Sequence, residues 1–131
     1  MRVELEQIAG RRFAIRARGL ELIVDDTVEA GGPGDGFRPT ELLLGALAAC
    51  MAGTMMNFAK GQEIPISGVS MALEDEVSKA PTRIGKVSVS MIVETGADGR
   101  EAQSLERVAA ACKIHNTLRS QTDIDVSFEV R

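Results

Sequence analysis

The sequence contains no Trp and no Tyr, and only four of its 131 residues are Phe. Proteins that bind nucleic acids stack aromatic rings on bases and use a basic face to neutralise phosphates. That basic face is missing as well, because the net charge is −4 and the isoelectric point is about 5.0. The two absences together predict that nucleic acid is not a partner of this protein.

Histidine and cysteine are scarce, with one His and two Cys in the whole chain. Cys112 and His115 have the spacing of a metal-binding pair, but a closed zinc site needs four ligands and only Cys50 is left to join them. The glycines between Gly31 and Gly36 lack the Lys-Ser or Lys-Thr ending of a phosphate-binding loop. We therefore expect neither a metal nor another bound cofactor.

The N-terminus lacks a long apolar stretch, because charged and apolar residues alternate from Met1 to Arg12. We therefore expect no signal peptide and a cytoplasmic protein whose thiols stay reduced. The uncharged run from Leu42 to Ala59 approaches the length of a membrane span. It contains Gly, Thr and Asn and lies between amphipathic elements, so we predict a buried helix of a soluble fold and no membrane partner.

The apolar residues alternate with polar ones in some segments and recur every three or four residues in others. The predicted elements are three strands (Val3–Ile8, Phe13–Ala17, Leu20–Val24), a loop (Asp25–Phe37), a helix (Thr40–Lys60), two strands (Val69–Leu73, Val87–Val93), a helix (Glu101–Cys112), an irregular polar segment with one helical turn (Lys113–Asp123) and a last strand (Ile124–Val130). Strands joined by hairpins predict an α+β fold with mainly antiparallel sheets, two main helices and a single domain over residues 1–131.

Both cysteines lie on apolar faces of predicted helices, Cys50 in the middle of the first helix and Cys112 at the end of the second. Free cysteines in such places are often only small apolar residues of the core. Lys113 and His115 follow Cys112 and favour an ionised thiol there. A Cys–His hydrolase is disfavoured, because Cys112, His115 and Asn116 are too close in sequence for a triad assembled in space. Core packing and a reactive thiol pair are the two readings that remain.

Two motifs give the chain a family resemblance. They are Arg38–Cys50, with the sequence RPTELLLGALAAC, and Ala110–Leu118, with the sequence AACKIHNTL. Together with the order of the strands, they resemble the OsmC/Ohr family over nearly the whole chain. The resemblance implies an OsmC-like fold and an intertwined homodimer, in which long apolar central helices pack between sheets contributed by both chains.

The resemblance also implies an activity, the thiol-dependent reduction of organic hydroperoxides. Cys50 would attack the peroxide and Cys112 would resolve the product into a disulfide, which a small dithiol or a lipoyl protein would reduce. Arg11 matches the family arginine that holds the thiolate. The glutamate that orients this arginine would be Glu41. Arg16 and Arg18 are the other candidates for the arginine.

The chain departs from the family pattern at two positions. Thr40 stands where the peroxidases carry their glutamate, and Lys113 stands where they carry a proline. Glu41, one residue later, lies about 180° from Cys50 on a regular helix. The departures place the chain nearer the broad OsmC-like branch than the dedicated organic hydroperoxide resistance proteins. The competing hypothesis is a weakly catalytic or non-catalytic domain that binds an apolar small molecule in the dimer groove.

Overall fold

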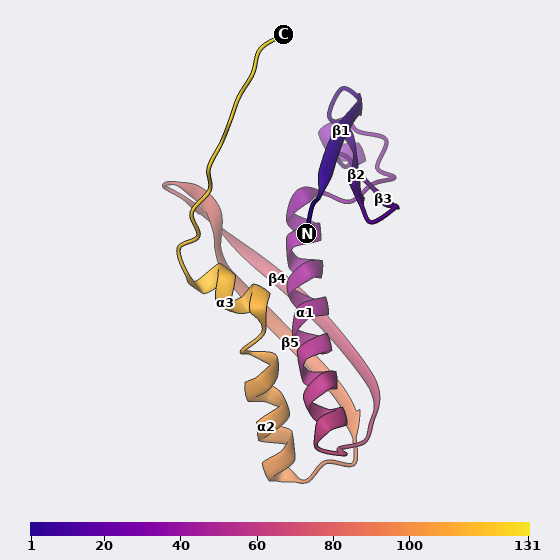
Figure 1. Cartoon of the computed structure of the whole chain (residues 1–131), viewed down its shortest axis with the longest axis vertical. Coiled ribbons are helices and arrows are strands. Elements are labelled where there is room, and N and C mark those ends of the chain that lie inside the picture. The colour runs from indigo at the N-terminus through magenta and orange to yellow at the C-terminus, as the bar shows by residue number, and fades with distance from the viewer. The chain divides into compact units, whose positions relative to one another are not determined.

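The computed structural model describes residues 1–131, which form two compact units, 1–45 and 46–131 (Figure 1). Each unit is described by itself. The elements are β1 (Glu4–Ala9), β2 (Arg12–Ala17), β3 (Leu20–Val24), the short 3₁₀ helix η1 (Val28–Ala30), α1 (Pro39–Gly61), β4 (Ile66–Lys79), β5 (Thr82–Thr95), α2 (Gly99–Ala109) and α3 (Lys113–Arg119). The predicted α+β class with antiparallel sheets is confirmed.

The first unit is built on an antiparallel sheet in the order β1-β2-β3. Alternation of apolar and polar residues forms these strands, and Ala14 and Val24 point into the small core of the unit. The loop after β3 returns to it, because the Phe37 N–H donates to the Ile23 carbonyl and the Asp25 N–H donates to the Phe37 carbonyl. The loop is therefore hydrogen-bonded to the edge of the sheet.

Helix α1 begins and ends at residues with clear physical roles. Pro39 occupies the first helical position, where its missing N–H costs no hydrogen bond. The Arg38 N–H donates to Glu41 Oε2 at 2.8 Å, which is one half of a capping box. The helix ends at Gly61, beyond Lys60, whose charge suits the negative end of the helix dipole. The predicted helix Thr40–Lys60 is confirmed.

The length and composition of α1 would also suit a membrane span. Only 22% of its most apolar 18-residue window is buried within the chain. The core helix of a soluble protein meets the same criteria, so the helix alone is weak evidence for a membrane.

The second unit contains a long antiparallel hairpin of β4 and β5, each 14 residues in length. Met71 lies opposite Met91, and Leu73 lies opposite Val89, so one face of the hairpin is apolar. Helix α2 starts with a capping box, in which Asp98 accepts the Glu101 N–H and Glu101 accepts the Asp98 N–H. The core that these elements share consists of Leu47, Met51, Met55, Ala59, Ile64, Leu105, Ala109 and Cys112.

Two sequence expectations for the C-terminal part require correction. The helix expected over Glu101–Cys112 spans Gly99–Ala109, because the capping box starts it earlier and Cys112 is the N-cap of the next helix. The expected strand Ile124–Val130 is not a strand, and its four apolar side chains are at least 81% exposed. A strand needs a partner edge, and no edge of this single chain pairs with that segment.

Candidate functional site

The thiol of Cys50 lies half-buried in the part of α1 that belongs to the second unit. Its Sγ accepts a hydrogen bond from the Ile114 backbone N–H at 3.5 Å. This N–H belongs to the first turn of α3, where backbone donors lack partners within the helix. One turn further along α1, the Thr54 hydroxyl donates to the Cys50 carbonyl at 2.8 Å. Cys50 is therefore held between its own helix and the start of α3.

The thiol of Cys112 is 1% exposed and lies at the start of the same short helix. Cys112 is the N-cap of α3, with an extended backbone, and its Sγ accepts the His115 N–H at 3.3 Å. Sulfur takes here the place that Ser or Asp oxygen usually has at an N-cap. The N–H groups of Ile114 and His115 are successive along the chain, so one helical turn brings the two sulfurs into one site.

The two thiols have opposite pKa shifts. The pKa of Cys50 is lowered, first by the Ile114 N–H, and further by the Cys112 thiol and the Lys113 N–H, against the opposing effect of burial. The pKa of Cys112 is raised, mainly by burial and also by the neighbouring Cys50, although the His115 N–H opposes the shift. The expectation that Lys113 and His115 favour an ionised thiol at Cys112 is therefore wrong, because burial outweighs their effect. Burial disfavours a thiolate, whereas donated hydrogen bonds favour it. The site thus holds a thiolate at Cys50 more readily than at Cys112.

The arginines named from the sequence lie in the first unit, where Arg11 and Arg16 form ion pairs. Arg11 lies in the turn between β1 and β2, and its Nε contacts Asp26 Oδ2 at 2.7 Å. Arg16 binds Glu6 and Glu21 across the sheet. Arg18 lies in the next turn, with a φ of 53°.

Glu41 also belongs to the first unit, where it caps the N-terminus of α1. The roles that the resemblance implies for Arg11 and Glu41 in the thiol chemistry stay predictions.

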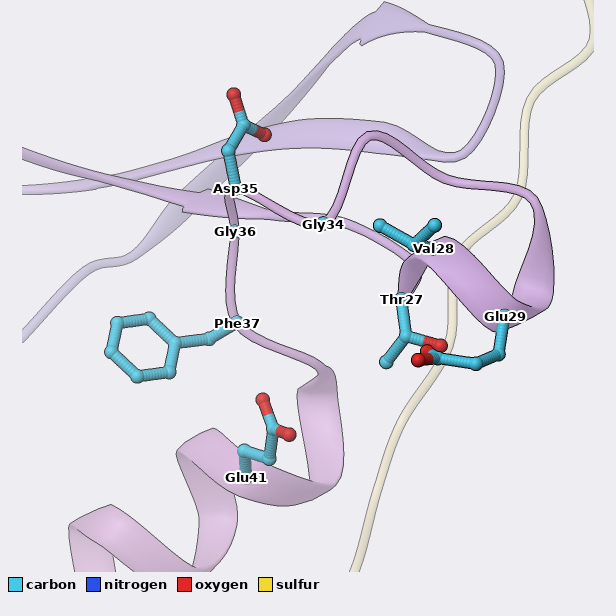
Figure 2. A pocket seen from close by; sticks show the side chains of 8 residues that line it. All are labelled: Thr27, Val28, Glu29, Gly34, Asp35, Gly36, Phe37 and Glu41. Carbon is cyan, nitrogen blue, oxygen red and sulfur yellow. The ribbon is translucent and has the colours of Figure 1, made fainter.

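A pocket in the first unit contains three carboxylates, as Figure 2 shows. Asp35 points away from the other two and binds Arg12, while Glu41 binds the Arg38 N–H. The pKa of Glu29 is lowered by its own backbone N–H and by Thr27. Carboxylates repel an anionic ligand such as a phosphate, and two of these three are already bound within the chain. The thiol pair in the second unit is therefore the stronger candidate site.

Sequence reasoning did not find the backbone donors to the two sulfurs or the unusual state of His115. The Nδ1 atom of His115 is buried and has no hydrogen-bond partner in the chain. A usable signal was present, because a helix that starts at Lys113 would place the N–H groups of its first turn beside Cys112. Cysteine is not among the common N-cap residues, so the start of α3 was not recognised.

Comparison with known proteins identifies the fold and the family. The family model for OsmC-like proteins matches residues 32–127. An organic hydroperoxide resistance protein OsmC from Legionella pneumophila is 26% identical, with a TM-score of 0.66 over 91% of this chain and 90% of that chain. The organic hydroperoxide resistance protein OhrB of Bacillus subtilis is 24% identical, with a TM-score of 0.64 over 94% of both chains.

A third solved structure, an OsmC-like protein from Mycoplasma pneumoniae, is 18% identical, with a TM-score of 0.75 over 91% of this chain and 88% of that chain. No curated protein matches the sequence significantly. The residues that the family model matches cover most of the chain and include both cysteines. The resemblance seen in the sequence is therefore confirmed, and the chain belongs to the family of OsmC-like proteins.

Proposed function

We propose that this protein is a thiol-dependent peroxidase that reduces organic hydroperoxides through a two-cysteine cycle. Cys50 attacks the peroxide and Cys112 resolves the product. The observation that carries the proposal is the pair of thiols at one turn of α3, with the pKa lowered at Cys50 and raised at Cys112. The names of the similar proteins from Legionella pneumophila and Bacillus subtilis, which are hydroperoxide resistance proteins, support the same chemistry.

The proposed cycle uses the difference between the two sulfurs. The Cys50 thiolate attacks the outer oxygen of the hydroperoxide, so that an S–O bond forms and the O–O bond breaks. The departing alkoxide takes a proton from water and leaves as the alcohol. Cys50 is then a sulfenic acid, oxidised by two electrons. Cys112 attacks the sulfenic sulfur, an S–S bond forms, and water leaves. An external dithiol, small or lipoyl-bound, returns both cysteines to the reduced state by thiol exchange.

The proposed enzyme is a cytoplasmic, interlocked homodimer in which residues 1–131 act as one domain. Support comes from apolar surface that a single chain leaves uncovered, on β1 and along the C-terminal segment. The exposed residues are Leu5, Ile8, Ile124, Val126, Phe128 and Val130. Monomers rarely expose so much apolar surface, and an obligate dimer typically buries more than about 2,000 Å². A monodisperse monomer at micromolar concentration would contradict this assembly.

Turnover of cumene hydroperoxide with dithiothreitol or dihydrolipoamide as reductant tests the catalytic proposal. We expect Cys50→Ser to abolish turnover. Cys112→Ser should allow one round and then accumulate sulfenic and sulfinic acid at Cys50, seen by mass spectrometry. A matched control is Glu6→Gln, which removes an exposed carboxylate of the first unit and should turn over like the wild type. Full turnover by Cys50→Ser would contradict the proposal.

A second candidate function is the binding of an apolar small molecule without catalysis. It is favoured by a cavity of about 500 Å³ in the second unit, lined by apolar side chains that include Met51, Met55 and Met91. Cavities of this size and character suit small apolar ligands. Tight binding of an apolar fluorescent probe by a protein whose cysteines ignore hydroperoxide would favour this candidate over the peroxidase.

A further inference from the structure

His115 is the only histidine of the chain, and the proposed cycle has not yet given it a role. It lies in the first turn of α3, three residues after Cys112, and its backbone N–H donates to Cys112 Sγ. Its ring nitrogen Nδ1 is buried and has no hydrogen-bond partner in the chain. Buried polar atoms are normally paired, so an exception in the turn that holds both sulfurs calls for an explanation.

The second step of the proposed cycle, in which Cys112 attacks Cys50, supplies an explanation for this unpaired nitrogen. Cys112 is almost completely buried, and burial keeps it as a neutral thiol in the reduced protein. A thiol must lose its proton to become the nucleophile that closes a disulfide. Buried Cys112 has little access to water as a proton acceptor, so a base from the protein would speed the step.

We propose that His115 accepts the proton of Cys112 when Cys112 attacks Cys50. The inference rests on the proposed two-cysteine cycle and concerns its resolving step. With the proton of the neutral imidazole on Nε2, the lone pair of Nδ1 takes the Cys112 proton. The S–S bond then forms, the S–O bond at Cys50 breaks, and the imidazolium returns a proton to the departing hydroxide, which leaves as water. The contact between Nδ1 and the Cys112 thiol forms during this step, because the reduced chain has none.

The other polar side chains of this helix are poor substitutes for His115. Lys113 and Arg119 are exposed cations, which have no lone pair to offer at neutral pH. Asn116 does not bind protons, and its amide nitrogen donates to the Ala111 carbonyl at 3.2 Å. Imidazole is the side chain whose proton affinity suits acid and base roles near neutral pH.

The resolving step can be measured without any peroxide. In the reduced, full-length protein, Cys50 is first converted to a mixed disulfide with thionitrobenzoate, and mass spectrometry confirms the loaded position. Attack by Cys112 then releases a coloured thiolate, which needs no proton to leave. We expect His115→Gln and His115→Ala to slow this release by about 100-fold. Asn116→Ala, a change in the same helix, should release at the wild-type rate.

Added imidazole distinguishes proton transfer from a structural role, because it can occupy the space that His115→Ala leaves and accept the proton itself. We expect imidazole to restore release in His115→Ala and to have no effect on the wild type. Wild-type release in both His115 variants would overturn the proposal, and so would slow release that imidazole does not restore. Since no peroxide takes part, this result is independent of whether the protein reduces hydroperoxides.

Discussion

The two units of the chain use their polar groups in different ways. In the first unit, Arg11, Arg12 and Arg16 are each bound to carboxylates, and the buried Asp25 is bound to Arg12. In the second unit, the groups that stand out are two free thiols, whose hydrogen bonds come from the backbone N–H groups of one helical turn. A charge that is already paired is less available for chemistry, whereas a partly exposed thiol with a lowered pKa is available for it.

The largest expected effect on stability concerns the core of the second unit. Met55 is 0% exposed, at the centre of the apolar cluster beside the thiol site. Met55→Ala removes buried side-chain atoms and leaves a cavity, so we expect a loss of about 2–5 kcal/mol in the free energy of unfolding. Urea unfolding followed by circular dichroism measures it.

The matched variant for the first unit is Glu6→Gln, which breaks an exposed ion pair with Arg16. Exposed pairs contribute little to stability, so the urea midpoint should stay unchanged. An equal loss of stability in Met55→Ala and Glu6→Gln would remove the contrast between the units.

A smaller effect is expected from the helix caps, and one cap from each unit can be compared. Asp98 closes a two-sided capping box at the start of α2, the helix that leads to Cys112. Asp98→Ala should lower the free energy of unfolding by about 1 kcal/mol. Thr27 caps only the short η1 of the first unit, through a long hydrogen bond of 3.3 Å, so Thr27→Ala should have a smaller effect in the same urea assay. The reverse order would show that α2 does not depend on its cap.

Within the thiol site, Cys50 and Cys112 can be compared by the pH dependence of their alkylation. A lowered pKa keeps Cys50 ionised to lower pH, so its alkylation rate should reach half its maximum below the pH of an ordinary thiol, about 8.5. The pKa of Cys112 is raised, so the midpoint of its alkylation should lie above the pH of an ordinary thiol. Iodoacetamide labelling read by mass spectrometry separates the two cysteines. In concentrated urea the two midpoints should coincide, and a difference that persists there would mean that the fold is not its cause.

Much of the fold could be predicted because its signals are local. Val87–Val93 alternates as a strand must, and Pro39 and Glu41 mark the start of α1. The segment Ile124–Val130 has the same alternation, yet it has no partner strand within the chain. Strand pairing depends on residues far away in sequence or on another chain, so a local pattern does not decide it.

Prediction from the sequence was limited in a similar way at the candidate site. The resemblance singled out Cys50 and Cys112, but the pKa of Cys50 depends most on the backbone N–H of Ile114. Every non-proline residue carries such an N–H, so its role is not visible in the residue type. Arg11 was named as the cation for the thiolate, and in the first unit it contacts Asp26. The difference between the two thiols could therefore be derived only from their three-dimensional surroundings.

A single stoichiometric pulse of cumene hydroperoxide tests the central claim most directly. The reduced protein is mixed with one equivalent of peroxide, quenched with an alkylating reagent, and the state of each cysteine is read by mass spectrometry beside a free-thiol control. The account predicts loss of the Cys50 thiol first, followed by a disulfide between Cys50 and Cys112. If both cysteines remain reduced under a pulse that oxidises the control, the protein is not a two-cysteine peroxidase.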